Sequence, residues 1–210
     1  MTGKMHQCSN NLKNQNNVYL YSFVISIILF FGLFIPIINC LENRFDFPIP
    51  VWLETPSIIG IYCSMITLFD ELIWKYKWIK YLRLPLIPNL NGNWSTEVSS
   101  GDYPKIKAEV KIIQTFSKFS LVLKTSASSS VSKMASFDLS NPIKRTISYQ
   151  YLNKPKSKAF ETMNIHEGTG ILDIDCNENK LSGYYYSGRG RETYGDISLE
   201  RTHSKACAGD

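Results

Sequence analysis

The stretch that decides the fold is Leu181–Arg201, LSGYYYSGRGRETYGDISLER. Apolar and polar residues alternate on both sides of the glycine-rich segment SGRGR, which predicts two antiparallel strands joined by a turn. In the second strand Ile197 and Leu199 are apolar and their direct neighbours are polar, so this pair must face the core. An inner face assigned in this way can be followed along the chain in steps of two residues.

Counting back from Ile197 in steps of two brings the inner face to Thr193, Arg191 and Arg189. The inner face of this hairpin therefore changes from apolar at one end to polar and basic at the other. The register across the two glycines of the turn stays open, because glycines allow bulges.

The rest of the chain after residue 91 shows the same alternating pattern, interrupted by turn residues. Eight strands are predicted, over residues 92–99, 106–115, 118–125, 130–138, 144–152, 165–175, 179–186 and 192–200. Eight antiparallel strands can close into a barrel whose interior holds side chains or one small ligand. The first strand opens with Gly92 and Trp94, as in small up-and-down barrels, and we expect Trp94 to plug one end of the core.

We call the alternation of inward-facing residues in steps of two along a strand its inward parity. In the other strands, inward parity places polar and aromatic side chains beside the arginines of the hairpin. We predict that one rim of the barrel forms a ligand site from Tyr149, Tyr151, Asn153, His166, Tyr185, Arg189, Arg191 and Thr193. Arginine binds phosphates through its paired N–H groups, and tyrosine rings can stack on nucleobases. The alternative is that the tyrosines only fill strand positions, which they favour, and that the arginines are turn charges.

Signals for catalysis are weak in this sequence. It contains no HExxH, P-loop, GxSxG or paired-cysteine motif. A lone strand histidine such as His166 is more often structural than catalytic, and the 5 scattered cysteines suggest neither a disulfide framework nor a zinc site. We therefore predict that the protein is not an enzyme and has no catalytic residues, no metal site and no cofactor.

The net charge of the chain bears on which kinds of molecule it binds. A charge of +5 without a dense basic run fits a phosphate-bearing small molecule or an anionic membrane surface. Proteins that bind DNA or RNA polymers more often carry a concentrated basic stripe, so no such partner is expected.

The beginning of the chain differs from the strand-rich part. Val18–Leu41 carries no charged residue and is long enough to span a membrane as a helix. A cleaved signal peptide fits less well, because the run is too long and no small-residue cleavage site follows it. Thr55–Phe69 is a shorter uncharged run, and it can span a membrane only if Glu54, Asp70 and Glu71 lie at the interfaces.

The flanking charges set the expected orientation and the domain organisation. Basic residues before the first run and after the second favour the cytosolic side for both ends of the chain. The predicted fold class is membrane α plus all-β: a two-helix transmembrane hairpin followed by a small eight-stranded antiparallel β-barrel. Its predicted parts are an N-terminal tail (1–17), the hairpin (18–80), a linker (81–90), the barrel (91–202) and a C-terminal tail (203–210).

The order of these features resembles a known family. Two membrane helices and a short basic linker precede a barrel that opens with Gly92 and Trp94. The barrel contains the run NIHEGTGIL, with His166 and Gly170, and ends in the Leu181–Arg201 hairpin. This arrangement resembles the two-transmembrane, β-strand-rich effectors of CBASS anti-phage operons, the SMODS-associated minimal β-barrel family, and the resemblance covers most of the chain.

The resemblance implies a function. Such a protein lies in the bacterial inner membrane, and its cytosolic barrel binds a cyclic dinucleotide second messenger. Binding drives self-association into oligomers, the helices disrupt the lipid bilayer, and the infected cell dies. Two alternatives come from other classes: a membrane-anchored, lipocalin-like carrier of apolar ligands, and a non-enzymatic membrane adaptor that binds a protein partner.

Overall fold

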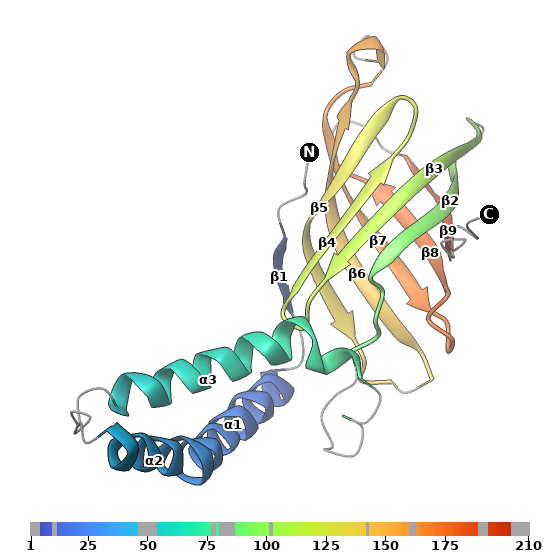
Figure 1. Cartoon of the computed structure of the whole chain (residues 1–210). Helices are drawn as coiled ribbons and strands as arrows, with labels where there is room; N and C mark the ends of the chain where they lie inside the picture. Colours follow the sequence, from blue (N-terminus) through green and yellow to red (C-terminus); the bar gives the residue numbers. More distant parts are fainter. Residues whose placement is uncertain are drawn as a thin grey trace, which may run out of the picture. The chain divides into compact units, whose positions relative to one another are not determined.

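The computed structural model describes residues 5–9, 12–45, 54–76, 79, 87–100, 103–141, 143–159, 163–188 and 193–202. The chain divides into two compact units. Residues 11–86 form a helical unit, whereas residues 1–10 join residues 87–210 in a unit that contains all the strands of the described residues. Figure 1 shows the elements of both units.

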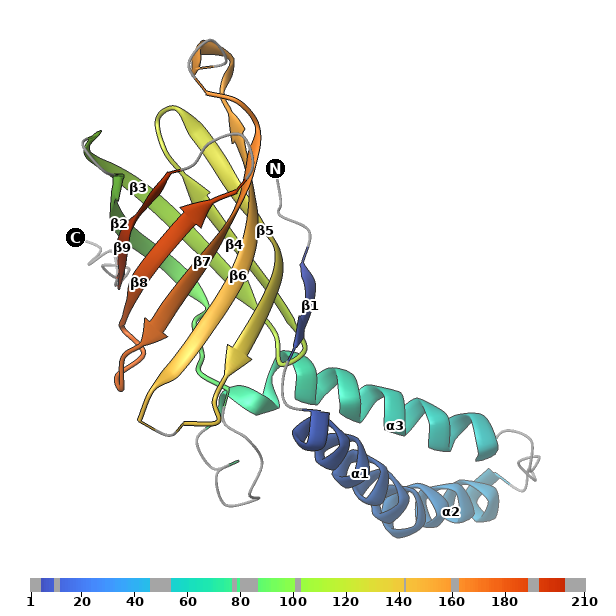
Figure 2. The ribbon, with the colours of Figure 1, turned by 180° about the vertical axis from the view of Figure 1, so that it is seen from behind.

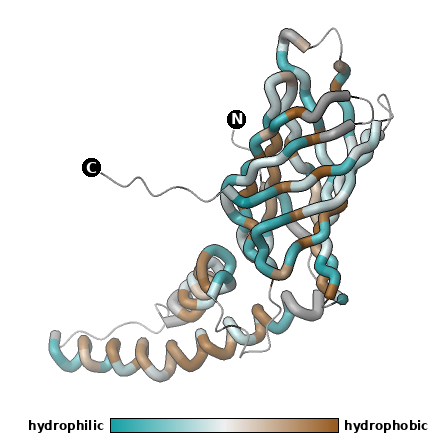
Figure 3. The backbone as a smooth tube through the Cα atoms, turned by 90° about the vertical axis from the view of Figure 1, so that its right-hand side faces the viewer, coloured by the Kyte–Doolittle hydropathy of each residue, from teal (hydrophilic) through white to brown (hydrophobic). Residues whose placement is uncertain are grey.

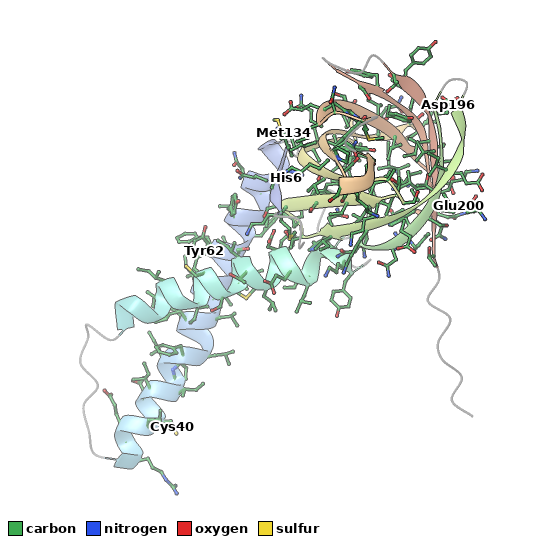
Figure 4. All side chains as sticks on the ribbon, turned by 90° about the horizontal axis from the view of Figure 1, so that it is seen from above. His6, Cys40, Tyr62, Met134, Asp196 and Glu200 are labelled. Carbon is green, nitrogen blue, oxygen red and sulfur yellow. The ribbon has the colours of Figure 1, made fainter. Side chains whose placement is uncertain are left out.

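The helical unit consists of one long helix with an irregular turn and one shorter helix. Its elements are α1 (Leu12–Leu29), a π-helical turn (Phe30–Phe34), α2 (Ile35–Phe45), α3 (Glu54–Glu71) and a 3-10 turn (Ile73–Lys75). The π-helical turn ends two residues before Pro36, which has no N–H to donate, and the Ile35 N–H donates to the Phe30 carbonyl. Phe23 of α1 and Tyr62 of α3, the latter labelled in Figure 4, pack edge to face with ring centroids 5.9 Å apart.

One helix of the described residues is long and apolar enough to cross a membrane, judged by length and composition. This candidate span, Asn16–Arg44, is 29 residues long and contains the predicted run Val18–Leu41. The brown stretches of the helices in Figure 3 show the hydrophobic residues. α3 does not meet the same criterion of length and composition, because Glu54, Asp70 and Glu71 lie within its 18 residues. The predicted two-helix transmembrane hairpin is therefore not confirmed: the described residues contain one candidate span, in its predicted first helix.

The predicted eight-stranded antiparallel barrel is confirmed. Its strands are β2 (Gly92–Ser100), β3 (Tyr103–Gln114), β4 (Lys118–Lys124), β5 (Ser128–Asp138), β6 (Arg145–Pro155), β7 (His166–Ile174), β8 (Lys180–Ser187) and β9 (Tyr194–Arg201). Each strand pairs with the next, and β9 pairs with β2 to close the barrel, with Leu199 opposite Thr96. The glycine-rich segment SGRGR thus joins β8 to β9, as predicted.

A further strand, β1 (His6–Ser9), was not predicted, because residues 1–17 were treated as a tail. β1 pairs antiparallel with β4 and parallel with β5. Figure 2 shows it beside these strands. The segment is four residues long and has no repeating apolar pattern, so its pairing depends on edges supplied by distant parts of the chain.

Trp94 closes one end of the barrel core, as predicted. Trp94 is 1% exposed and donates its indole N–H to the Leu90 carbonyl at 3.0 Å. The Arg201 guanidinium lies 4.6 Å from the centroid of the Trp94 ring, so a cation–π contact covers this plug. Gly92 has a φ of +134°, a conformation that glycine adopts more readily than other residues. The end of the barrel next to Trp94 is therefore closed by packed side chains.

Candidate ligand-binding site

The barrel holds a cavity at the end opposite the Trp94 plug. Its volume is about 270 Å³, and its lining comes from the ends of strands at the β2–β3, β4–β5, β6–β7 and β8–β9 connections. The apolar part of the lining includes Leu121, Leu123 and Ile197. Polar and aromatic side chains supply the remainder, so the cavity can hold a ligand that is partly aromatic and partly polar.

Six of the eight predicted site residues line this cavity. They are Tyr149, Tyr151, Asn153, His166, Tyr185 and Thr193, contributed by β6, β7, β8 and the residue before β9. The other two, Arg189 and Arg191, lie outside the described residues. Side chains from separate strands thus meet at one end of the barrel, as inward parity predicted.

Two glycines of β7 make room for the tyrosine rings of β6. Tyr149 is paired with Gly170, and Tyr151 with Gly168. A Cβ atom on Gly170 would lie 2.5 Å from the Tyr149 ring, and one on Gly168 would overlap the Tyr151 hydroxyl. The two rings therefore lie across the backbone of β7, with their centroids 6.2 Å apart and their planes at 44°. The run HEGTGIL positions the aromatic wall by leaving these two places without side chains.

The Tyr149 side chain is buried in this wall. Burial raises the pKa of its hydroxyl well above the usual range, because the phenolate would lose hydration, and the nearby Tyr151 and Tyr185 add to the effect. Tyr149 consequently stays a neutral phenol at physiological pH. Its hydroxyl is available as a hydrogen-bond donor or acceptor rather than as a charged group.

Asn153 is fixed by two polar contacts. The Ser130 hydroxyl donates to Asn153 Oδ1 at 2.9 Å, and Asn153 Nδ2 donates to the Met163 sulfur at 3.3 Å. The pair Ser130–Asn153 is also a direct cross-strand pair of β5 and β6. Asn153 is 4% exposed, so the amide is held in one orientation against the cavity. An amide held in this way can discriminate between ligands by their donor and acceptor pattern.

A chain of hydroxyl groups follows β8 into the start of β9. The Tyr151 hydroxyl lies 3.5 Å from Ser187 Oγ, and Ser187 Oγ lies 3.0 Å from Thr193 Oγ1. The Ser187 N–H also donates to the Thr193 carbonyl at 2.7 Å. These contacts join both sides of the β8–β9 connection that carries Arg189 and Arg191. They fix the two ends of that connection at the mouth of the cavity.

His166 has a defined hydrogen-bonding direction. Its Nδ1 lies 2.9 Å from the Asn164 carbonyl. A carbonyl can only accept, so Nδ1 carries the proton, and Nε2 of the neutral ring is an acceptor. His166 is buried among the lining residues, where it can accept a hydrogen bond from a ligand N–H or O–H.

Several lining residues were missed by the sequence analysis. Ser187 continues the inward series Leu181, Gly183, Tyr185 by one more step, so parity could have found it. Ser130 could have been found as the cross-strand partner of Asn153, once the register of β5 on β6 was known. Met163 belongs to the connection between β6 and β7, and no periodic signal marks it.

The chemistry of the cavity is neutral. Its described lining contains no aspartate, glutamate, lysine or arginine. Tyrosine, serine, threonine, asparagine and histidine side chains provide hydrogen bonds and aromatic faces. This lining suits a nucleobase and a sugar, whereas a phosphate needs cations from elsewhere.

Comparison with known proteins identifies the family of the strand-rich unit. A family described as Cap15, cyclic dinucleotide receptor domain, matches residues 86–201. The chain belongs to the Cap15 family. A curated relative, CD-NTase-associated protein 15 of Yersinia aleksiciae, is 33% identical over 145 residues, which make up 68% of this chain and 68% of the relative.

The Cap15 match confirms the predicted family and the predicted class of ligand. The family is one of CBASS effectors, and the ligand of its receptor domain is a cyclic dinucleotide rather than a cofactor. The matched range ends at Arg201, the last residue of β9, and includes every strand from β2 onward. β1, α1, α2 and α3 lie outside this range.

Proposed function

We propose that this chain is a membrane effector of CBASS anti-phage defence. In this proposal a cyclic dinucleotide binds at the cavity, copies of the chain assemble, and their helices disrupt the inner membrane and kill the infected cell. The observation that carries the proposal is the cavity with its neutral, aromatic lining inside a cyclic dinucleotide receptor domain. The protein then acts by binding and assembly, without a chemical reaction of its own.

The size of the cavity favours partial entry of the ligand. Its volume of about 270 Å³ lies just below the range of about 300–1,000 Å³ typical of small-molecule sites. We expect one nucleoside of the cyclic dinucleotide to enter, with its base against Tyr149, Tyr151 or Tyr185. Stacking of this kind is worth about 1–3 kcal/mol per base in proteins that bind single strands.

The phosphates would then lie at the mouth of the cavity. The described lining offers them no cation, and the β8–β9 connection begins and ends there, at Ser187 and Thr193. Arg189 and Arg191 belong to that connection. We propose that they bind the two phosphates through charge-assisted hydrogen bonds, which are stronger than neutral ones. Asn153 and His166 would read the base or the sugar that enters.

In this proposal the helices of the chain lie in the membrane and disrupt it. Asn16–Arg44 is the membrane span that length and composition support. We propose that α3 is a second, shorter span whose acidic ends lie at the interfaces, and that both chain ends face the cytosol because the flanking residues are basic. The barrel would then meet a second messenger made in the cytosol.

Assembly would follow from a difference in affinity. A ligand shifts a conformational equilibrium only by binding one state more tightly than the other. About 5.5 kcal/mol of differential binding would move a population from 1:99 to 99:1. Contacts between the two phosphates and Arg189 and Arg191 of the β8–β9 connection are a source of such a difference.

A vesicle assay tests the whole proposal. The full-length chain is reconstituted into dye-loaded vesicles of bacterial lipid composition, and a panel of cyclic dinucleotides is added. We expect dye release with at least one member of the panel, and much less with the Tyr185→Ala or Arg189→Ala variant. A Lys107→Ala variant serves as the control, because Lys107 is an exposed residue outside the cavity lining. Absence of release with every member of the panel would contradict the proposed output.

The lipocalin-like alternative has one observation in its favour, the apolar part of the lining at Leu121, Leu123 and Ile197. It predicts that lipid copurifies with the barrel and fills the cavity. Native mass spectrometry of the full chain distinguishes the two functions. Bound lipid that cyclic dinucleotides do not displace would support the carrier function.

A further inference from the structure

The strand β1 occupies a fork between two barrel strands. β4 and β5 pair directly only near their connecting turn, at Val122–Val131, Leu123–Ser130 and Lys124–Ser129. Beyond this point the register of β5 shifts between Ser132 and Met134. β1 fills the space that follows, pairing with β4 on one side and β5 on the other. The fork therefore has two strand edges that need a third strand to satisfy their backbone groups.

β1 makes few strand pairs with its neighbours. It is four residues long and makes two residue pairs with each neighbour: His6–Phe119 and Gln7–Lys118 with β4, and Cys8–Ala135 and Ser9–Ser136 with β5. In Figure 4 His6 lies at the same side of the barrel as Met134, which marks the irregular part of β5.

The side chain of His6 is only partly satisfied in the fork. Its Nε2 is 2.7 Å from Ser132 Oγ, and its ring packs against Phe119 with centroids 6.3 Å apart. Its Nδ1 is buried without a hydrogen-bond partner among the described residues. A buried polar atom without a partner costs free energy. The free energy that stabilises β1 in the fork is therefore smaller than its four residue pairs alone would give.

We propose that the fork between β4 and β5 is a docking site for β1 of a second copy of this chain. An incoming β1 has the same sequence and can make the same pairs, so exchange costs no contacts. The donor's β1 is joined to its own α1 through residues 10 and 11 alone. An exchanged strand would therefore connect the barrel of one copy to the candidate membrane helix of another. Because each copy has one β1 and one fork, repeated exchange can extend into a ring or a chain of copies.

A short series of contacts joins the fork to the cavity. Leu121 lines the cavity, and its backbone N–H donates to Ser132 Oγ at 2.9 Å. The same Ser132 oxygen bonds to His6 of β1. A shift of Leu121 on ligand entry would act on the hydrogen bond that holds β1. Exchange itself does not depend on the proposed function, since it requires only the fork and a second copy.

Disulfide trapping between separate chains tests the exchange. Gln7 and Lys118 are exposed, paired residues of β1 and β4. One sample of full-length protein carries Gln7→Cys and another carries Lys118→Cys, both with Cys8→Ser, and the two carry different tags. They are mixed in detergent and oxidised mildly. We expect a disulfide-linked dimer that contains both tags, because Cα atoms of paired strand residues lie within disulfide range.

Two controls make the outcome decisive. A chain with Gln7→Cys and Lys118→Cys together should form the bond within itself, which verifies the β1–β4 register. A Lys107→Cys chain, exposed on β3 away from the fork, measures random collisions with the Gln7→Cys chain. The proposal is overturned if the mixture gives no more mixed dimer than this control. It is also overturned if the double variant forms no internal bond, since β1 would then not occupy the fork.

Discussion

At the scale of single residues, the shape of the cavity wall depends on two glycines of β7. Gly168 and Gly170 let the rings of Tyr151 and Tyr149 lie across β7. A tyrosine opposite a glycine is a common way to fill an empty place in a sheet. The two tyrosines are therefore part of the core and part of the proposed site at the same time.

Substituting Gly170→Ala should disturb both roles. The added methyl group would meet the Tyr149 ring at 2.5 Å, so the ring must move toward the cavity. Overpacking of this kind costs about 1–3 kcal/mol, and we expect lower thermal stability together with weaker ligand binding.

The matched control for this variant is Thr169→Ala, which changes the neighbouring, half-buried position of the same strand. Combining Gly170→Ala with Tyr149→Ala should lower stability by less than the sum of the single effects, because the clash is removed. Additive effects in this double-mutant cycle would show that the ring and the glycine are not coupled.

Replacing Arg189 and Arg191 by alanine should weaken binding and make it less sensitive to salt. Charge-assisted contacts with phosphates are screened by ions, so their loss removes part of the salt dependence. Calorimetric titrations at low and high salt measure this. Lys107→Ala is the control, since it removes a positive charge outside the cavity lining. An unchanged affinity in the double variant would mean that other groups bind the phosphates.

The docking of β1 should depend on pH through His6. Partial burial lowers the pKa of the docked His6 below its ordinary value of 6.5. In the released strand the ring takes up a proton as the pH falls below 6.5, whereas the docked ring resists protonation. Docking is therefore fully present above pH 6.5 and weakens as the pH falls toward the lowered pKa.

Hydrogen exchange of residues 5–9, compared with that of β8 amides, measures this docking above and below pH 6.5. His6→Gln keeps a polar group near Ser132 and does not titrate, so its docking should be independent of pH in the same range. Equal pH dependence in both proteins would rule out His6 as the cause.

At the scale of elements, the barrel strands could be predicted because each carries its own alternating pattern. The segment TISYQYLN shows the alternation directly, and the structure buries Ile147, Tyr149, Tyr151 and Asn153 on one side. Parity alone was thus enough to bring residues from β6, β7 and β8 to the same cavity. The predicted and observed ends of the strands differ by up to three residues, because pairing with the neighbouring strand decides where a strand begins and ends.

The strand β1 could not be predicted for a physical reason. Its four residues, HQCS, contain no alternation, and their pairing is set by the fork between β4 and β5. That fork depends on the register shift near Ser132, which the sequence does not mark. The neutral hydroxyl contacts of Ser130 and Ser187 were missed for a similar reason, since they follow from register.

At the scale of the whole molecule, the proposed topology can be tested with reporter fusions. We expect a fluorescent reporter at either end of the chain to fluoresce, and alkaline phosphatase at either end to stay inactive, because both ends are proposed to be cytosolic. The same phosphatase inserted at residue 48, between α2 and α3, should be active. Activity of a C-terminal phosphatase fusion would mean that α3 does not span the membrane.

The central claim is that the barrel cavity binds a cyclic dinucleotide. Its most direct test is a calorimetric titration of the full-length chain in detergent with a panel of cyclic dinucleotides and their linear counterparts. We predict saturable binding of at least one cyclic dinucleotide, with a loss of about tenfold or more in affinity for Asn153→Ala, equivalent to about 1.4 kcal/mol. Binding that is unaffected by Asn153→Ala and Tyr185→Ala, or no binding by any cyclic member of the panel, would contradict the account.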